Sequence, residues 1–203
     1  ADRLPEDFAS PPPPPPPADS VFIVDDDLVN VKVLQRAFAK AQPRPFGVVV
    51  TGDDGRDVVE ALVTRDAAYD VVLLDENMRH MNGSTATAEL RKHEARKGAT
   101  RRQLVIVTTG NASETDKLKY QRAGFDAIMV KPMNLKLVVR WVREYHAFFR
   151  ATDAGATFGR RALPDGCPAP ERRPTSTFED GYFFGEIEVF GRVPRAKDGT
   201  NEQ

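Results

Sequence analysis

Residues 71 to 75 of the chain read Val71-Val72-Leu73-Leu74-Asp75. Four consecutive apolar residues are typical of a short strand that is buried on both faces, as in a parallel sheet. This run ends on a carboxylate. Ligands of open parallel sheets bind beyond the carboxyl ends of the strands, so we expect Asp75 to lie where chemistry takes place.

Three other apolar runs end on polar residues in the same way. They are residues 21–24, followed by Asp25-Asp26-Asp27; residues 104–107, followed by Thr108-Thr109-Gly110; and residues 127–130, followed by Lys131-Pro132. With a further strand at 46–51, five strands alternate with five segments of helical periodicity. We predict an α/β fold: a doubly wound, flavodoxin-like five-stranded parallel sheet, in the order 2-1-3-4-5, with helices on both faces.

The chain of 203 residues is long enough for one domain with extensions. Residues 1–19 include seven consecutive prolines and predict an extended linker, with docking to a partner's groove as the alternative. Residues 20–150 form the predicted domain. Residues 151–203 are rich in Gly, Pro and Arg, and we expect one strand at 182–193 but no independent domain.

Composition excludes several classes of function. The net charge is −1 and the basic stretch 91–102 has no interleaved aromatic residues, so we expect no nucleic-acid partner. No apolar run approaches the roughly 20 residues of a membrane span, and no signal peptide is recognisable. The single Cys167 fits a reducing compartment, so we expect a cytoplasmic location and leave a nuclear one open.

The acids at the predicted sheet edge need a counter-ion. Two carboxylates about 4 Å apart repel by roughly 4 kcal/mol at an effective dielectric near 20. Asp25, Asp26 and Asp75 are oxygen ligands, and no His or Cys follows these strands, which favours Mg²⁺ over zinc. Taken alone, Asp25-Asp26-Asp27 also fits a turn with a helix cap.

A carboxylate beside such a metal can attack phosphorus and form an aspartyl phosphate. A cation and a hydroxyl would then stabilise the equatorial oxygens of the transferring group. Lys131 and Thr109 supply these two groups at successive strand ends.

These residues resemble the receiver domain of two-component response regulators. The resemblance covers residues 20–150 and rests on five elements in the family's order: Asp25-Asp26, Asp75, Met78 to Gly83, Thr109-Gly110-Asn111-Ala112 and Lys131-Pro132. A proline-rich spacer before such a domain also resembles the C-terminal receiver of a hybrid histidine kinase.

The resemblance implies that Asp75 accepts a phosphoryl group from a histidine kinase or a histidine phosphotransfer protein. It further implies that Mg²⁺ is bound by Asp25, Asp26, Asp75 and the backbone carbonyl of Asn77, and that Thr109 and Lys131 sense the phosphate. Such a domain is not a conventional enzyme, because it catalyses its own phosphorylation and dephosphorylation.

Two features depart from the family pattern. The loop Met78-Arg79-His80-Met81-Asn82-Gly83 lacks the proline and the acid of the usual Met-Pro-x-Met-Asp-Gly, and we expect His80 to be solvent-exposed. Ile128 stands where the family usually has the aromatic residue that switches together with the Thr. The switch pair is thus Thr109 and Ile128, without an aromatic ring.

Two alternatives remain. Asp25-Asp26-Asp27-Leu28-Val29 fits the Asp-x-Asp-x-Val motif of haloacid-dehalogenase-type phosphatases, with Asp25 as nucleophile. That family also needs a late acidic pair, which we do not find after Lys131, and it would leave Asp75 unexplained. The other alternative is a binding module that keeps the receiver fold without phosphotransfer.

The predicted last helix, residues 134–149, has two apolar stripes. A helix needs one such stripe to dock on a sheet, and the second contains Leu137, Trp141, Tyr145 and Phe148. Either the aromatic tail covers this second stripe, or it forms a homodimer or effector contact. In the second case Trp141 would lie on the output surface.

Overall fold

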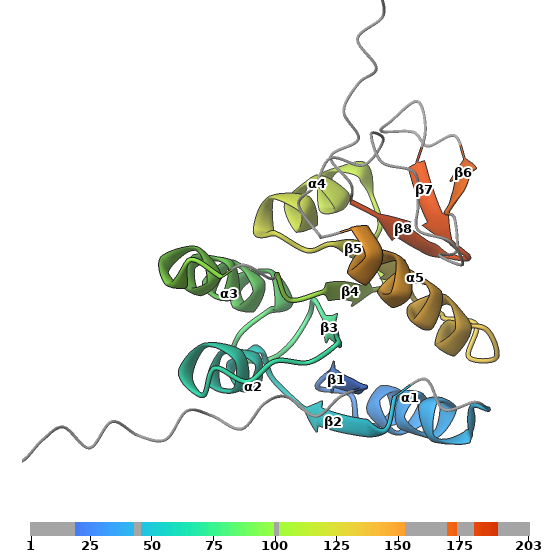
Figure 1. The fold of residues 1–203 in the computed structure, drawn as a ribbon, viewed down its shortest axis with the longest axis horizontal. Coiled ribbons are helices and arrows are strands. Elements are labelled where there is room, and N and C mark those ends of the chain that lie inside the picture. Colours follow the sequence, from blue (N-terminus) through green and yellow to red (C-terminus); the bar gives the residue numbers. More distant parts are fainter. Residues whose placement is uncertain (1–18, 43–45, 100–101, 153–169, 174–180, 191–203) are drawn as a thin grey trace, which may run out of the picture.

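The computed structural model describes residues 19–42, 46–99, 102–152, 170–173 and 181–190. Within them, one mixed sheet lies between two layers of helices (Figure 1). The strands are β1 (Ser20–Val24), β2 (Val48–Gly52), β3 (Val71–Asp75), β4 (Val105–Thr109), β5 (Ala127–Val130), β6 (Glu171–Arg173), β7 (Gly181–Phe184) and β8 (Ile187–Val189). The helices are α1 (Leu28–Lys40), α2 (Gly55–Val59) with its π-helical continuation η1 (Glu60–Thr64), α3 (Gly83–Lys97), α4 (Glu114–Ala123) and α5 (Val138–Thr152).

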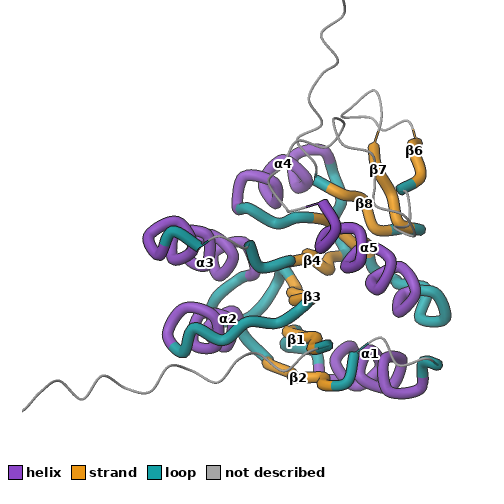
Figure 2. Tube along the Cα trace, viewed as in Figure 1, coloured by secondary structure: helices purple, strands orange, loops and turns teal. Residues whose placement is uncertain are grey.

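The sheet confirms the predicted fold class and extends it. Strands β2, β1, β3, β4 and β5 are parallel neighbours in that order, as predicted. Beyond β5 the sheet continues with β8, β7 and β6, which pair antiparallel (Figure 2). Val24 is paired with Leu74, and Leu74 with Val107, so the carboxyl ends of β1, β3 and β4 lie at one edge.

Each face of the sheet has its own apolar core. Helices α1 and α5 cover one face, and α2, α3 and α4 cover the other (Figure 1). Side chains alternate along β1: Val21 and Ile23 join the cluster under α1 and α5, whereas Phe22 and Val24 join the opposite one. Because both faces are buried, the strand sequence shows no polar alternation.

Local hydrogen bonds determine where the helices begin. Asp27 caps α1 as predicted, since its Oδ1 accepts from the Val29 N–H at 2.8 Å. Helix α5 begins at Val138, four residues later than predicted. The carbonyl of Asn134 accepts from the Leu137 and Val138 N–H groups, and its side chain accepts from the Lys136 N–H, so this segment forms a turn before the helix.

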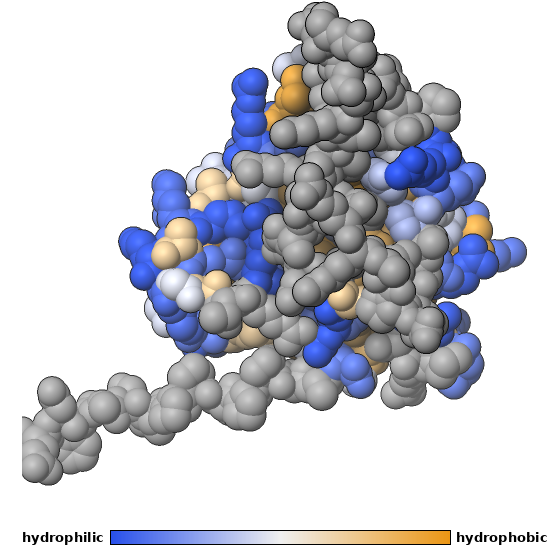
Figure 3. Space-filling model, turned by 45° about the horizontal axis from the view of Figure 1, so that its top comes forward, coloured by the Kyte–Doolittle hydropathy of each residue, from blue (hydrophilic) through white to orange (hydrophobic). Residues whose placement is uncertain are grey.

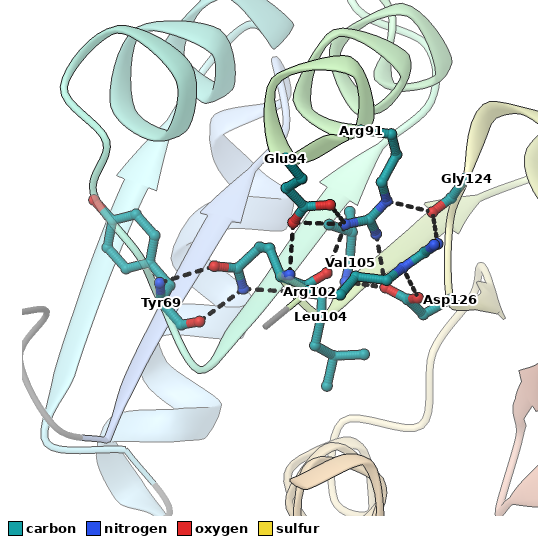
Figure 4. Close-up of polar contacts among 9 residues, drawn as sticks. Tyr69, Arg91, Glu94, Arg102, Leu104, Val105, Gly124 and Asp126 are labelled. Carbon is teal, nitrogen blue, oxygen red and sulfur yellow. Dashed lines mark hydrogen bonds and ion pairs between the residues drawn. The ribbon is translucent and has the colours of Figure 1, made fainter. Parts of the chain in front are cut away.

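A polar network ties α3 to the amino-terminal ends of β4 and β5 (Figure 4). Arg91 donates to the carboxylates of Glu94 and Asp126 and to the carbonyls of Gly124 and Gln103, each at 2.9 Å. Although Arg91 begins the basic stretch 91–102, its side chain is only 14% exposed, because these four acceptors surround its guanidinium group.

The tail contains more strand than the sequence indicated. In place of one strand at 182–193, β7 and β8 form a hairpin around the turn Gly185-Glu186, and Phe184 is paired with Ile187. Gly185 has a φ of 64°, which permits the tight turn. We missed β7 because Tyr182-Phe183-Phe184 has no polar alternation, although Tyr182 and Phe184 are buried.

The hairpin covers the second apolar stripe of α5. The Phe184 ring lies 5.3 Å from that of Tyr145 and 5.2 Å from that of Phe148, between ring centroids. A side chain at Gly185 would clash with Trp141, so the turn itself packs on the indole. Trp141 is only 4% exposed. This agrees with the first of the two alternatives, in which the aromatic tail covers the stripe.

The proline-rich stretch up to residue 18 lies outside the described residues, as do 153–169, 174–180 and 191–203. Figure 3 shows the hydrophilic surface of the described part around α3. None of its helices combines the length and the apolar character needed to cross a membrane.

Candidate functional site

Three carboxylates converge beyond the carboxyl ends of β1 and β3. Asp25 and Asp26 follow β1, Asp75 ends β3, and one oxygen of each lies within 4.8 Å of the others. The paired register of β1 and β3 places them together, as predicted from the strand ends. Asp25 is 2% exposed and Asp75 5%, so both carboxylates lie at the bottom of the site, while Asp26 is half-buried.

Lys131 supplies the counter-charge. Its Nζ donates to Asp25 Oδ2 at 2.7 Å and to Asp75 Oδ1 at 2.6 Å. Burial alone would lower the pKa of Lys131, but the hydrogen bonds to the two carboxylates outweigh it and raise this pKa. Burial, aided by repulsion from Asp25, raises the pKa of Asp75 despite the contact with Lys131. The ammonium group thus offsets part of the repulsion between the two acids.

Both oxygens of Asp25 and both oxygens of Asp75 accept hydrogen bonds. Asp25 Oδ1 accepts from the Asp27 N–H and the Asn30 side chain, and its Oδ2 accepts from Lys131. Asp75 accepts from Lys131 on one oxygen and from the Asn77 N–H on the other, at 2.8 Å. Asn77 therefore lies beside the site, and its N–H contacts Asp75.

The donor set fits a hard divalent cation. Three carboxylates with oxygens within 4.8 Å of one another form an all-oxygen site, which is the preference of Mg²⁺. Asp26 is the more accessible of the three carboxylates, and its Oδ2 lies 3.9 Å from Nε of Arg79. Asp25, Asp26 and Asp75 would hold such an ion.

Thr109 and Ile128 lie on the α4 side of the site. Thr109 is buried at the end of β4, where its Oγ1 lies 3.1 Å from the hydroxyl of Tyr120 on α4. Ile128 is buried on β5 within the core under α2, α3 and α4. The sequence placed Thr109 at this edge but gave no indication that Tyr120 is its neighbour.

Two further acids hold the loop that follows Asp75, and sequence reasoning missed both. The Asp54 side chain accepts from the backbone N–H groups of His80 and Met81, at 3.0 and 3.4 Å. Glu76 accepts from both the N–H and the hydroxyl of Ser84, and it pairs with Lys119 at 2.5 Å. These bonds order a loop that lacks the family's proline. His80 itself is exposed, as expected.

Gly83 brings the end of this loop against the backbone of Asp75. A Cβ at Gly83 would clash with the backbone carbonyl of Asp75. Asn82 caps the helix that follows, because its side chain accepts from the Thr85 N–H at 2.8 Å. Position 83 therefore needs a glycine, because any larger residue would clash with the backbone of Asp75.

Comparison with known proteins assigns the class. The family model described as the response regulator receiver domain matches residues 21–143. The chain belongs to this family.

The individual relatives are signalling proteins. The chain is 28% identical over 120 residues to hybrid signal transduction histidine kinase I of Dictyostelium discoideum, covering 58% of this chain and 7% of that protein. It is 31% identical over 115 residues to stress response regulator protein 1 of Candida tropicalis, covering 57% and 40%. The chain thus spans less than half the length of either relative.

Solved receiver structures have the same fold. The phosphorylated cyanobacterial phytochrome response regulator RcpA superimposes with a TM-score of 0.52 at 22% identity, covering 72% of this chain and 98% of that one. The receiver domain of the histidine kinase CKI1 from Arabidopsis thaliana, complexed with Mg²⁺, gives 0.50 at 26% identity, covering 63% and 91%.

Proposed function

We propose that this receiver domain takes a phosphoryl group from a phosphohistidine onto Asp75, with Mg²⁺ held by Asp25, Asp26, Asp75 and the carbonyl of Asn77. The observation that carries the proposal is the position of Lys131, whose Nζ lies within 2.7 Å of both Asp25 and Asp75. The donor is a histidine kinase or a histidine phosphotransfer protein, and the location is cytoplasmic or nuclear.

The chemistry assigns a role to each group. A carboxylate oxygen of Asp75 attacks phosphorus, the P–N bond to the donor imidazole breaks, and the imidazole leaves. Lys131 then pairs with the charge of the phosphoryl oxygens, and the Thr109 hydroxyl donates to one of them. The metal supplies further charge neutralisation when bound. Water later attacks the phosphorus, the bond to the Asp75 oxygen breaks, and inorganic phosphate leaves.

Family membership weakens the phosphatase alternative, because the receiver-domain model matches residues 21–143. That alternative would make Asp25 the nucleophile and would leave Asp75 without a role. Effector or homodimer contact through 134–149 is part of the proposal, although the β7–β8 hairpin occupies one stripe of α5 here.

The test is covalent labelling with acetyl phosphate or phosphoramidate and Mg²⁺. We expect one acid-stable, base-labile phosphoryl group, lost in Asp75→Asn. The matched control is Asp27→Asn, at an exposed residue of the same edge, because Asn caps helices as well as Asp. A label on Asp25 that persists in Asp75→Asn would favour the dehalogenase mechanism. No label from any donor, a cognate kinase included, would favour the inert binding module.

A further inference from the structure

The Thr109 hydroxyl forms a buried hydrogen-bond network with helix α4. Its Oγ1 lies 3.1 Å from the Tyr120 hydroxyl and accepts from the Asn111 N–H at 3.1 Å. The Tyr120 hydroxyl also lies 3.3 Å from the Asn111 carbonyl, which can only accept. The Tyr120 hydrogen therefore goes to that carbonyl, and Thr109 donates the hydrogen that joins the two hydroxyls.

Thr109 can donate either to Tyr120 or to a phosphoryl group on Asp75, but not to both. A threonine hydroxyl has one hydrogen, so a phosphoryl oxygen on Asp75 that accepts it leaves Tyr120 without this donor. Thr109 and Tyr120 are both buried, so water does not replace the lost bond at no cost. The lost bond is one of the contacts that hold Tyr120, and with it α4, at the end of β4.

Tyr120 supplies from α4 a hydroxyl that β5 cannot supply. Ile128, in the same core cluster, has no polar side-chain atom. The Tyr120 ring packs edge-to-face on Phe125, with centroids 6.0 Å apart, which fixes its hydroxyl beside Thr109. Burial raises the pKa of this hydroxyl, so it stays protonated near neutral pH.

The same helix holds the C-terminal hairpin. Lys117 lies three residues before Tyr120 on α4, hence on the same side of the helix. Its Nζ pairs with Glu188 of β8 at 2.7 Å, and the two side chains are 15% and 10% exposed. Glu188 lies directly opposite Ile128 in the β5–β8 pairing. A shift of α4 at Tyr120 therefore acts on a nearly buried ion pair at the junction of β5 and β8.

We propose that Tyr120 is the positioning residue through which Thr109 controls α4, and that the β7–β8 hairpin is the surface that responds. In the unphosphorylated state the Thr109–Tyr120 bond holds α4 so that Lys117 retains Glu188 and the hairpin stays paired with β5. Phosphorylation breaks that bond and loosens the hairpin. This inference rests on the proposed function, since it requires a phosphoryl group on Asp75.

The test is amide hydrogen exchange of the full chain with and without beryllofluoride and Mg²⁺, a mimic of the phosphoryl group. The readout is the segment 186–190, in which the Phe190 N–H donates to the Asp126 carbonyl across the β5–β8 junction at 2.9 Å. We expect the mimic to speed exchange there about fivefold, the effect of losing roughly one net hydrogen bond. In Tyr120→Phe, exchange should be fast already without the mimic and should change little when it is added.

Two further variants separate this coupling from general loss of structure. Tyr69→Phe removes a hydroxyl from a tyrosine that is only partly buried and whose backbone contacts Gln103, just before β4, and it should respond to the mimic like the parent chain. Lys117→Gln should speed exchange at 186–190 while the Thr109–Tyr120 bond remains. If the mimic protects the loop after Asp75 but leaves 186–190 unchanged, or acts equally on Tyr120→Phe, the inference is wrong. If the mimic protects nothing near Asp75, the proposed function fails, and this inference with it.

Discussion

Replacing Phe184 with alanine removes a ring that lies between the β7–β8 hairpin and α5. Phe184 is 3% exposed and packs on Tyr145 and Phe148, with ring centroids 5.3 and 5.2 Å away. The substitution leaves the backbone pairing of β7 intact. It therefore tests how much of the hairpin's attachment depends on side-chain packing.

The expected cost follows from this burial. Truncating a fully buried Phe to Ala typically costs about 3–5 kcal/mol, part of it from the cavity that remains. The loss cannot exceed the free energy that docks the hairpin on α5, because a larger penalty would make the hairpin detach. We therefore expect the free energy of unfolding to fall by about 3 kcal/mol.

Urea unfolding of the full chain, followed by Trp141 fluorescence, measures both effects. Trp141 is the sole tryptophan and lies under the Gly185 turn, so a detached hairpin should shift its native emission to the red. The matched control is Phe183→Ala, at a half-buried neighbour on the other face of β7, where we expect a loss below about 1 kcal/mol. Equal losses in both variants, or a loss in Phe184→Ala below about 1 kcal/mol with unchanged emission, would refute this account of the packing.

Three other substitutions test the site and its support. Asp26→Asn should abolish Mg²⁺ binding in a calorimetric titration and leave the unfolding midpoint unchanged or raised, because it relieves carboxylate repulsion; unchanged binding would contradict the metal assignment. Gly83→Ala should cost about 2–3 kcal/mol and slow phosphoryl labelling, because its Cβ meets the backbone carbonyl of Asp75. Gly98→Ala, with a φ of 63° and open space around it, should cost only about 1 kcal/mol and leave labelling intact; equal effects would count against the steric argument. Arg91→Met should destabilise by about 3 kcal/mol in urea, near the low end for a broken buried pair, because another arginine still pairs with Asp126; a loss under about 1 kcal/mol would show that the network is dispensable.

The arrangement of the site could be predicted because each of its main groups directly follows an apolar run. Asp75 ends β3, Asp25 follows β1 and Lys131 follows β5, and parallel strands end at one edge. The structure brings these three side chains within hydrogen-bond distance through Lys131. Their roles in phosphotransfer stay predictions.

Contacts between distant elements could not be predicted in this way. Nothing in the helical pattern of α4 distinguishes Tyr120 from an ordinary core aromatic, because its hydroxyl partner comes from β4. Asp54 fits a helix cap in sequence, and it is one, but it also binds the loop after Asp75. Such double roles depend on the three-dimensional approach of two segments, which spacing along one segment does not encode.

The β7–β8 hairpin could not be predicted for a different reason. A strand needs a neighbouring strand to pair with, and the sequence does not indicate that β8 pairs with β5 or that β7 pairs with β8. The alternation at Glu186–Val189 identified β8 alone.

The position of the three added strands also bears on self-association. In a five-stranded receiver sheet β5 would be an edge, with apolar Ile128 and Met129 beside unpaired backbone groups that invite pairing with another chain. Here β8 pairs with β5, and among the described strands β6 becomes the outer strand on this side, with β2 as the outer strand on the other. Strand β6 has three residues, Glu171–Arg173, all charged. A short charged edge pairs poorly with a neighbouring molecule, so the tail protects the β5 side of the sheet against edge-to-edge pairing.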